Sequence, residues 1–235
     1  MGQPIKPGTE TNVRFPSAGK SPVLLEGLLG TCDDGAKHPG VVLCHPGSHG
    51  QTGMEYPVIA ACSAALQQAG FITLRFNFRG VQGSEGRRSG GMYEIGDVQG
   101  AARFLMERNE VYPSYVYLIG NSFGAQMALE AAREEKGLAG VACIVLPLTL
   151  LPSPPDHLRY DQRPKLFIVA EHDQLCDLED FRVLYRQWAA PKDCIILTGS
   201  DHFLGIGPSA DPVNRAAEVA HAVASWLCRV TTAVR

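Results

Sequence analysis

Short apolar runs alternate with segments of helical periodicity along most of the chain. The apolar runs that predict strands occupy residues 12–15, 23–29, 40–44, 71–78, 115–119, 140–146, 165–170 and 193–198. The segments that predict helices occupy residues 56–69, 94–108, 125–135, 178–187 and 213–230. Strands rich in Val, Ile and Leu that alternate with helices are typical of a mostly parallel, twisted sheet with helices on both faces. The first two strands have no helix between them, so we expect them to form an antiparallel edge.

Length and charge narrow the class of protein. The chain has 235 residues, of which 45% are hydrophobic, and this suits a single α/β domain over residues 1–235. A net charge of −3 with scattered Lys and Arg gives no reason to expect a nucleic-acid partner. No apolar run reaches the roughly 18 residues that a membrane span needs, so no membrane partner is expected. The N-terminus lacks the apolar core of a signal peptide. The oligomeric state stays open.

The cysteines predict a reducing compartment. There are seven, an odd number, with no Cys-x-x-Cys pair, and several lie inside apolar runs. This pattern indicates buried, reduced thiols in a cytoplasmic protein. Their spacing matches no metal site. The glycines between residues 80 and 91 are irregularly spaced and no phosphate-loop motif is present, so we expect neither a metal nor another cofactor.

One motif carries most of the chemical information. The segment Gly120-Asn121-Ser122-Phe123-Gly124 follows the apolar run at 115–119 directly and precedes the helical segment at 125–135. A Gly-x-Ser-x-Gly motif between a strand and a helix predicts a sharp turn that holds the serine hydroxyl above the sheet. The glycines on either side are needed because a turn this tight leaves no room for side chains there. The motif therefore indicates a nucleophilic serine.

Two further polar residues follow later strands. Asp173 comes after the run at 165–170, and His202 comes after the run at 193–198. Chemistry in parallel α/β sheets gathers beyond the carboxyl ends of the strands, so we expect both to lie near Ser122. A histidine can take the serine proton and return it to the leaving group, and a buried carboxylate fixes its tautomer. We predict Ser122 as nucleophile, His202 as general base and acid, and Asp173 as the orienting acid.

The acid has competitors in the same region. These are Glu171, Asp177 and Asp201. Asp177 precedes a helix, which is typical of an N-cap. Asp201 adjoins His202, and neighbours in sequence rarely face each other well enough to pair. Asp173 is favoured, and the other acids stay as alternatives.

The residues around the predicted nucleophile suggest an oxyanion hole and a binding pocket. An oxyanion hole needs two backbone N–H donors. One should be Phe123, the residue after the nucleophile, and the other should come from the loop after 40–44, with Gly47 first and Ser48 second. His45 could brace that loop or line the pocket with Ser48. Leu148 could wall an acyl pocket or pack on the core.

These features together resemble a known superfamily. The stretches that carry the resemblance are Leu43-Cys-His-Pro46, residues 70–80, Gly83-Ser-Glu-Gly86, Gly120-Asn-Ser-Phe-Gly124, Glu171-His-Asp173 and Asp201-His-Phe203. Over nearly its whole length the chain resembles the α/β-hydrolase superfamily, within it a small bacterial subgroup of dienelactone-hydrolase-like serine hydrolases. True dienelactone hydrolases have a cysteine nucleophile where this chain has Ser122. The resemblance fits the α/β-hydrolase fold and the three candidate catalytic positions, and it names no substrate.

Two more features bear on the resemblance. Arg79 belongs to the shared 70–80 stretch, and we interpret it as structural, in an ion pair with Glu94 or Asp97. The alternative is that Arg79, Arg87 or Arg88 binds a substrate carboxylate. Many hydrolases of this fold insert a helical cap, but residues 147–164 are too short and too rich in proline for a full cap. A minimal cap, or none, predicts an open site.

The predicted activity is that of a serine hydrolase. We expect it to act through an acyl-enzyme on a small or medium carboxylic ester or thioester, as carboxylesterases and thioesterases do. An acyltransferase or a peptidase would use the same three residues. A catalytically inactive α/β-hydrolase scaffold used for binding is the alternative from a different class.

Overall fold

A computed structural model describes residues 7–47, 53–206 and 214–232. Within these residues eight strands form one sheet in the order β1-β2-β4-β3-β5-β6-β7-β8. The strands are β1 (Pro7–Pro16), β2 (Leu24–Cys32), β3 (His38–Cys44), β4 (Ile72–Phe76), β5 (Val111–Asn121), β6 (Gly140–Ile144), β7 (Lys165–Ala170) and β8 (Lys192–Leu197). β2 is antiparallel to β1 and β4, whereas the remaining neighbours are parallel. The predicted sheet and its antiparallel edge are therefore confirmed.

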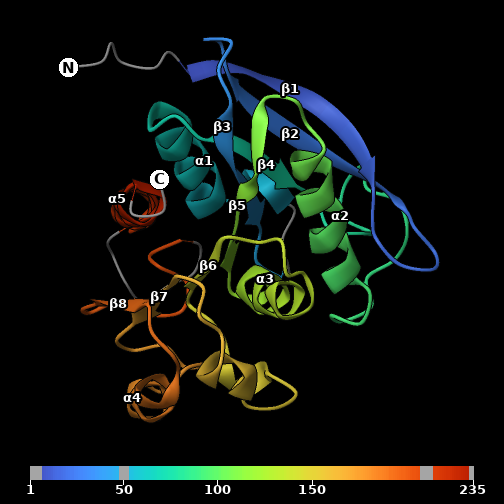
Figure 1. Cartoon of the computed structure of the whole chain (residues 1–235). Coiled ribbons are helices and arrows are strands. Elements are labelled where there is room, and N and C mark those ends of the chain that lie inside the picture. Colours follow the sequence, from blue (N-terminus) through green and yellow to red (C-terminus); the bar gives the residue numbers. More distant parts are fainter. Residues whose placement is uncertain (1–6, 48–52, 207–213, 233–235) are drawn as a thin grey trace.

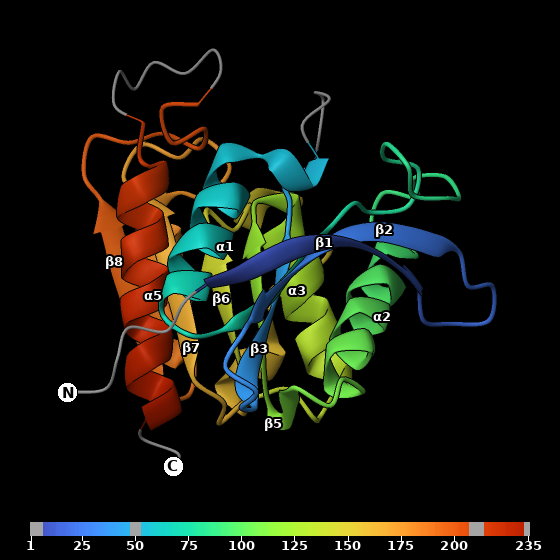
Figure 2. The same cartoon turned by 90° about the horizontal axis from the view of Figure 1, so that it is seen from above.

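In the described part of the chain, five α-helices cover the two faces of this sheet, as the alternation predicted. They are α1 (Pro57–Gln68), α2 (Glu94–Met106), α3 (Phe123–Glu134), α4 (Leu178–Gln187) and α5 (Ala216–Thr232). α1 and α5 lie together on one face, and α2, α3 and α4 lie on the other (Figures 1 and 2). None of these helices, in the part of the chain that is described, is long and apolar enough to cross a membrane.

Some boundaries differ from the prediction for local reasons. β4 ends at Phe76 rather than at residue 78. The Asn77 N–H still donates to the Glu26 carbonyl on β2, but the Phe78 N–H donates to the His45 ring and so leaves the sheet. β5 begins at Val111, because its first residue pairs with His38 before a shift of register. Residues 147–164 form only two short 3-10 helices, Leu148–Leu150 and Asp156–Arg159, so no helical cap is built there.

Alternate residues of the central strands build two hydrophobic layers. In β3, Val42 and Cys44 face α2 and α3, whereas Val41 and Leu43 face α1 and α5. All four are fully buried. Burial of apolar side chains on both sides of a strand, worth about 1.5–3 kcal/mol for a residue such as Leu, accounts for the dense apolar runs seen in the sequence.

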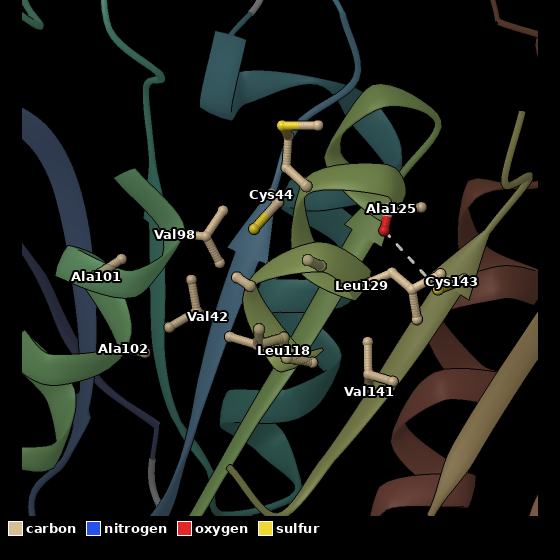
Figure 3. Packing of buried hydrophobic residues seen from close by; sticks show 14 of the residues in the cluster. Val42, Cys44, Val98, Ala101, Ala102, Leu118, Ala125, Leu129, Val141 and Cys143 are labelled. Carbon is tan, nitrogen blue, oxygen red and sulfur yellow. Dashed lines mark hydrogen bonds between the residues drawn. The ribbon is translucent and has the colours of Figure 1, made fainter. Parts of the chain in front are cut away.

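Helix α3 lies close against the sheet through small residues. Its Ala125 packs beside Cys143 of β6, and the Cys143 thiol lies 3.9 Å from the Ala125 carbonyl oxygen (Figure 3). Leu129, one turn further, lies over Leu118 of β5 and Val141 of β6. This close approach brings the first turn of α3 to the carboxyl ends of the central strands.

The N-terminal hairpin supports the loop that follows β4. The carboxylate of Glu26, on β2, accepts hydrogen bonds from the Asn77 side chain and from the Gly83 N–H, each at 2.6 Å. The Ser84 hydroxyl donates to the Asn77 carbonyl at 2.6 Å and accepts from the Glu26 N–H at 3.0 Å. The hairpin therefore fixes the conformation of residues 77–84.

The same loop is tied to α2 by a buried ion pair. Arg79 donates to Asp97 from its backbone N–H, its Nε and its Nη2, the last at 2.6 Å. Asp97, rather than Glu94, is thus the partner of Arg79, and this settles the alternative left open by the sequence. The contact is structural in kind, as predicted for Arg79.

Candidate active site

Ser122 lies in a strained turn between β5 and α3. Its backbone has φ 53° and ψ −116°, a left-handed conformation that side chains other than glycine rarely adopt. A Cβ atom on Gly120 would lie 2.1 Å from the Gly124 carbonyl oxygen, and one on Gly124 would lie 2.2 Å from the Cys44 carbonyl oxygen. Both glycines are therefore required, and the motif has the geometry that its sequence predicts.

The turn is held by backbone contacts to the next strand. The Ser122 N–H donates to the Ile144 carbonyl at 2.9 Å, and the Ser122 carbonyl accepts from Ala125 and Gln126 in the first turn of α3. The strain of a non-glycine residue in this region, of order 1–3 kcal/mol, persists only where the surroundings fix it in this way. The hydroxyl is thus held in place before any ligand binds.

The structure brings the predicted serine, histidine and acid together. The Ser122 Oγ lies 2.8 Å from His202 Nε2. His202 Nδ1 lies 2.9 and 2.8 Å from the two carboxylate oxygens of Asp173. Both partners of this inner contact are buried. The Leu175 N–H donates to Asp173 Oδ1 at 2.8 Å and so fixes the carboxylate.

Hydrogen bonding determines the tautomer of His202. An ionised carboxylate only accepts hydrogen bonds, so the proton of neutral His202 lies on Nδ1. Nε2 then has a free lone pair directed at the Ser122 hydroxyl, which donates to it. This arrangement can remove the serine proton as the oxygen attacks an electrophile, and it can stabilise the imidazolium that results.

The competing acids have other partners. Glu171 accepts from the Gly199 N–H at 2.8 Å. Asp177 caps α4 by accepting from the N–H groups of its first turn. Asp201 accepts from the Phe203 N–H at 2.9 Å within its own turn. Among these acids, Asp173 is the one that contacts the His202 ring.

The two predicted oxyanion donors lie side by side. A Cβ atom on Gly47 would lie 3.1 Å from the Phe123 Cβ, so the loop after β3 passes directly over the start of α3. The Phe123 N–H belongs to the first turn of α3, where N–H groups have no partner within the helix. Ser48, the second candidate, lies outside the described residues.

His45 braces this loop with both ring nitrogens. Its Nδ1 donates to the Pro46 carbonyl at 2.7 Å, and its Nε2 accepts from the Phe78 N–H at 3.2 Å. Burial lowers the pKa of His45 from 6.5 to about 4, which keeps the ring in the neutral form that this pair of bonds needs. His45 also lines the adjacent cavity, but its polar atoms are already used by the backbone.

A cavity of about 160 Å³ opens beside these residues. The rings of Phe78 and Phe123, with centroids 5.4 Å apart, and the side chain of Val81 form its apolar wall. Leu148 is not among the residues that line it and packs against the core on the α2–α4 face. Of the two interpretations of Leu148, core packing is therefore the one that the structure supports.

The rest of the wall is formed by Arg88, Gly90 and Glu94. The sequence offered Arg88 as one of three arginines that could bind a substrate carboxylate, whereas it did not single out Gly90 or Glu94 for binding. The buried carboxylate of Glu94 accepts from the Ser89 and Gly91 N–H groups and from the Ser89 hydroxyl, which lowers its pKa despite burial. Glu94 thereby fixes the loop that closes the cavity. In the sequence, Glu94 is an acid at the start of a predicted helix that follows a glycine-rich loop. That position alone indicates only a favourable contact with the helix dipole and does not predict a cavity wall.

Comparison with known proteins identifies the class. Residues 38–227 match the family described as alpha/beta hydrolase domain, so the chain belongs to this family. An uncharacterized protein of Rickettsia prowazekii (strain Madrid E) is 26% identical over 177 residues, which cover 70% of this chain and 71% of that protein.

Solved structures show the same fold. An alpha-beta serine hydrolase homologue from Coxiella burnetii is similar with 25% identity and a TM-score of 0.73, covering 92% of this chain and 97% of that one. XC6422 from Xanthomonas campestris, described as an α/β serine hydrolase without a lid, is similar with 20% identity and a TM-score of 0.73, covering 97% of each chain. Family membership and the likeness to a serine hydrolase homologue support a hydrolase activity.

Proposed function

We propose that the protein is a serine hydrolase that cleaves a small or medium carboxylic ester or thioester through an acyl-enzyme on Ser122. One observation carries this proposal: the continuous hydrogen-bond chain from the Ser122 hydroxyl through the His202 ring to the buried Asp173 carboxylate. In the family to which the chain belongs, such a chain at a strained strand-to-helix turn is the arrangement needed to activate a serine.

In the first half of the reaction the Ser122 oxygen attacks the substrate carbonyl carbon while its proton passes to His202 Nε2. The carbonyl oxygen becomes negative and is stabilised by the N–H groups of Phe123 and Gly47. His202 then gives the proton to the departing alcohol or thiol, and the acyl group stays on Ser122. Asp173 stabilises the imidazolium throughout.

In the second half, water takes the place of the leaving group. Its proton passes to His202 Nε2 as its oxygen attacks the acyl carbon, and the carboxylic acid leaves as Ser122 regains its proton. The short 3-10 segments at 147–164 support a substrate of small or medium size, because they build no helical cap over the site.

A fluorophosphonate probe tests the nucleophile. We expect stoichiometric labelling at Ser122, mapped by mass spectrometry, and no labelling of the Ser122→Ala variant. Hydrolysis of simple esters and thioesters should disappear in the same variant. Absence of labelling on folded protein would favour a non-catalytic binding scaffold. Labelling without hydrolysis would favour an acyltransferase or a peptidase with the same three residues.

A further inference from the structure

The cavity beside Phe123 points to the part of the substrate that the protein selects. Building on the function proposed above, we infer that this cavity receives the acyl group and limits it to an apolar chain of about two to six carbons. The inference depends on three properties of the cavity: its side of the site, its size and its polarity.

The side of the site distinguishes the acyl group from the leaving group. The leaving group must lie next to His202 Nε2, because that atom returns the proton to it. The cavity is lined instead by Gly47 and by Phe123, the neighbour of Ser122, whose N–H groups face the carbonyl oxygen in the proposed mechanism. Neither Ser122 nor His202 is part of its wall. A substrate bound with its carbonyl carbon at Ser122 therefore directs its acyl chain into the cavity.

The size of the cavity limits the length of that chain. A volume of about 160 Å³ lies well below the roughly 300–1,000 Å³ of pockets that hold drug-sized ligands. At about 30 Å³ for a group the size of a water molecule, it accommodates about five methylene-sized groups. Val81 and Phe78 are buried wall residues, so a chain cannot extend in their direction without displacing them.

The polarity of the wall favours an apolar chain. The Phe78 and Phe123 rings and Val81 provide hydrocarbon surface. His45 is neutral and already bonded through both ring nitrogens, and the Glu94 carboxylate is already bonded to Ser89 and Gly91. A hydrocarbon chain therefore leaves no polar group of His45 or Glu94 unpaired when it enters.

Arg88 in the wall makes it necessary to compare apolar acyl chains with acid-terminated ones. Arg88 lines the cavity, is exposed and carries a positive charge. A chain that ends in a carboxylate would approach this guanidinium. The test therefore includes an acid-terminated acyl chain of the same length as an apolar one, and the inference predicts that the apolar chain is preferred.

The experiment measures kcat/KM for nitrophenyl esters with acyl chains from acetyl to dodecanoyl, together with the hemisuccinate ester. We expect a maximum between butanoyl and hexanoyl and a fall of at least tenfold at decanoyl, in line with the 10- to 200-fold that one methylene can be worth in a hydrophobic pocket. Butanoyl esters of larger phenols of matched acidity are the control, because the fall must follow the acyl part.

Variants of Val81 test the cavity itself. Val81→Ala should move the maximum to chains about two carbons longer, and Val81→Phe should restrict hydrolysis to acetyl and propanoyl esters. Val183, an exposed valine on α4, is the matched control, and Val183→Ala and Val183→Phe should leave the profile unchanged. Thermal unfolding checks that each variant is folded.

The outcomes separate the two proposals. If no ester or thioester is hydrolysed, the proposed function fails and this inference fails with it. Hydrolysis with a flat dependence on acyl length, or an unchanged profile in both folded Val81 variants, overturns the inference alone. A preference for the hemisuccinate over the butanoyl ester overturns the apolar part of it and assigns Arg88 to the binding of a carboxylate.

Discussion

Replacement of Asp173 by Asn tests the hydrogen-bond chain at its most informative point. The side chain keeps its size, but one carboxylate oxygen becomes an amide NH₂. The Leu175 N–H, 2.8 Å from Asp173 Oδ1, needs an acceptor, so the amide oxygen of the variant should remain there. The NH₂ group then faces His202 Nδ1 and can only donate to it.

The expected loss follows from the tautomer. With an amide donor at Nδ1, the neutral His202 ring must carry its proton on Nε2, 2.8 Å from the Ser122 hydroxyl. That atom can then no longer accept the serine proton. A wrong tautomer in a serine–histidine–acid site costs about 10⁴-fold in kcat. At 1.36 kcal/mol for each factor of ten, this corresponds to about 5.4 kcal/mol of transition-state stabilisation.

The assay compares kcat/KM on a short-chain ester for the wild type, Asp173→Asn and Asp177→Asn. Asp177 is the matched control, because it is an acid of the same segment that caps α4, and Asn is an equally good N-cap. We expect a loss of about 10⁴-fold in the first variant and little change in the second. The reasoning is refuted if Asp173→Asn retains a tenth of wild-type activity while thermal unfolding shows a native fold.

Three further predictions concern stability. Ser122→Gly should unfold at a higher denaturant concentration than Ser122→Ala, because glycine is not strained at φ 53°. The difference in the free energy of unfolding should be about 1 kcal/mol, and equal midpoints would argue against strain at this residue. Gly124→Ala should destabilise by more than about 3 kcal/mol, since its Cβ would lie 2.2 Å from a backbone oxygen, whereas Gly137→Ala, with a nearest contact of 3.5 Å, should change stability by less than about 1 kcal/mol. Urea unfolding of both variants decides this. The pKa of His45 is lowered to about 4 in the folded protein. Its contribution to the free energy of unfolding is therefore fully present above pH 6.5 and is lost as the pH falls toward 4, at up to about 1.4 kcal/mol per pH unit. His45→Gln should lack this part of the pH dependence, and parallel curves for wild type and variant would contradict it.

The sequence was sufficient for the fold and for the side chains at the strand ends. Strands such as Lys165–Ala170 are buried on both faces, so they appear as dense apolar runs with sharp ends. The residues just after such ends must meet at one edge of a parallel sheet, and Asp173 and His202 do lie within hydrogen-bond distance of each other. Their positions after the strands favoured them, but Glu171, Asp177 and Asp201 stayed as alternatives, and the contact with the His202 ring is what distinguishes Asp173.

The cavity wall could not be predicted in the same way. Phe78 and Val81 lie in a loop that has no periodicity, and their positions depend on contacts with distant segments. Glu94 was visible only as an acid in a first helical turn, whereas its contacts are with Ser89 and Gly91 in the preceding loop. Local patterns specify elements and their ends, but the shape of a pocket depends on how loops pack after the elements have assembled.

The position of Glu26 separates two properties of the protein. The hairpin β1–β2 ends at Cys32, before the segment 38–227 that matches the family. Glu26 on that hairpin nevertheless hydrogen-bonds to Asn77 and Gly83, which lie at the two ends of the loop that supplies Phe78 and Val81. Sequence change in the hairpin therefore reaches the cavity wall without altering the strands that carry Ser122, Asp173 and His202. With the cavity as the acyl site inferred above, we expect substitutions within residues 7–32 to change the substrate range while the contacts among Ser122, His202 and Asp173 are kept.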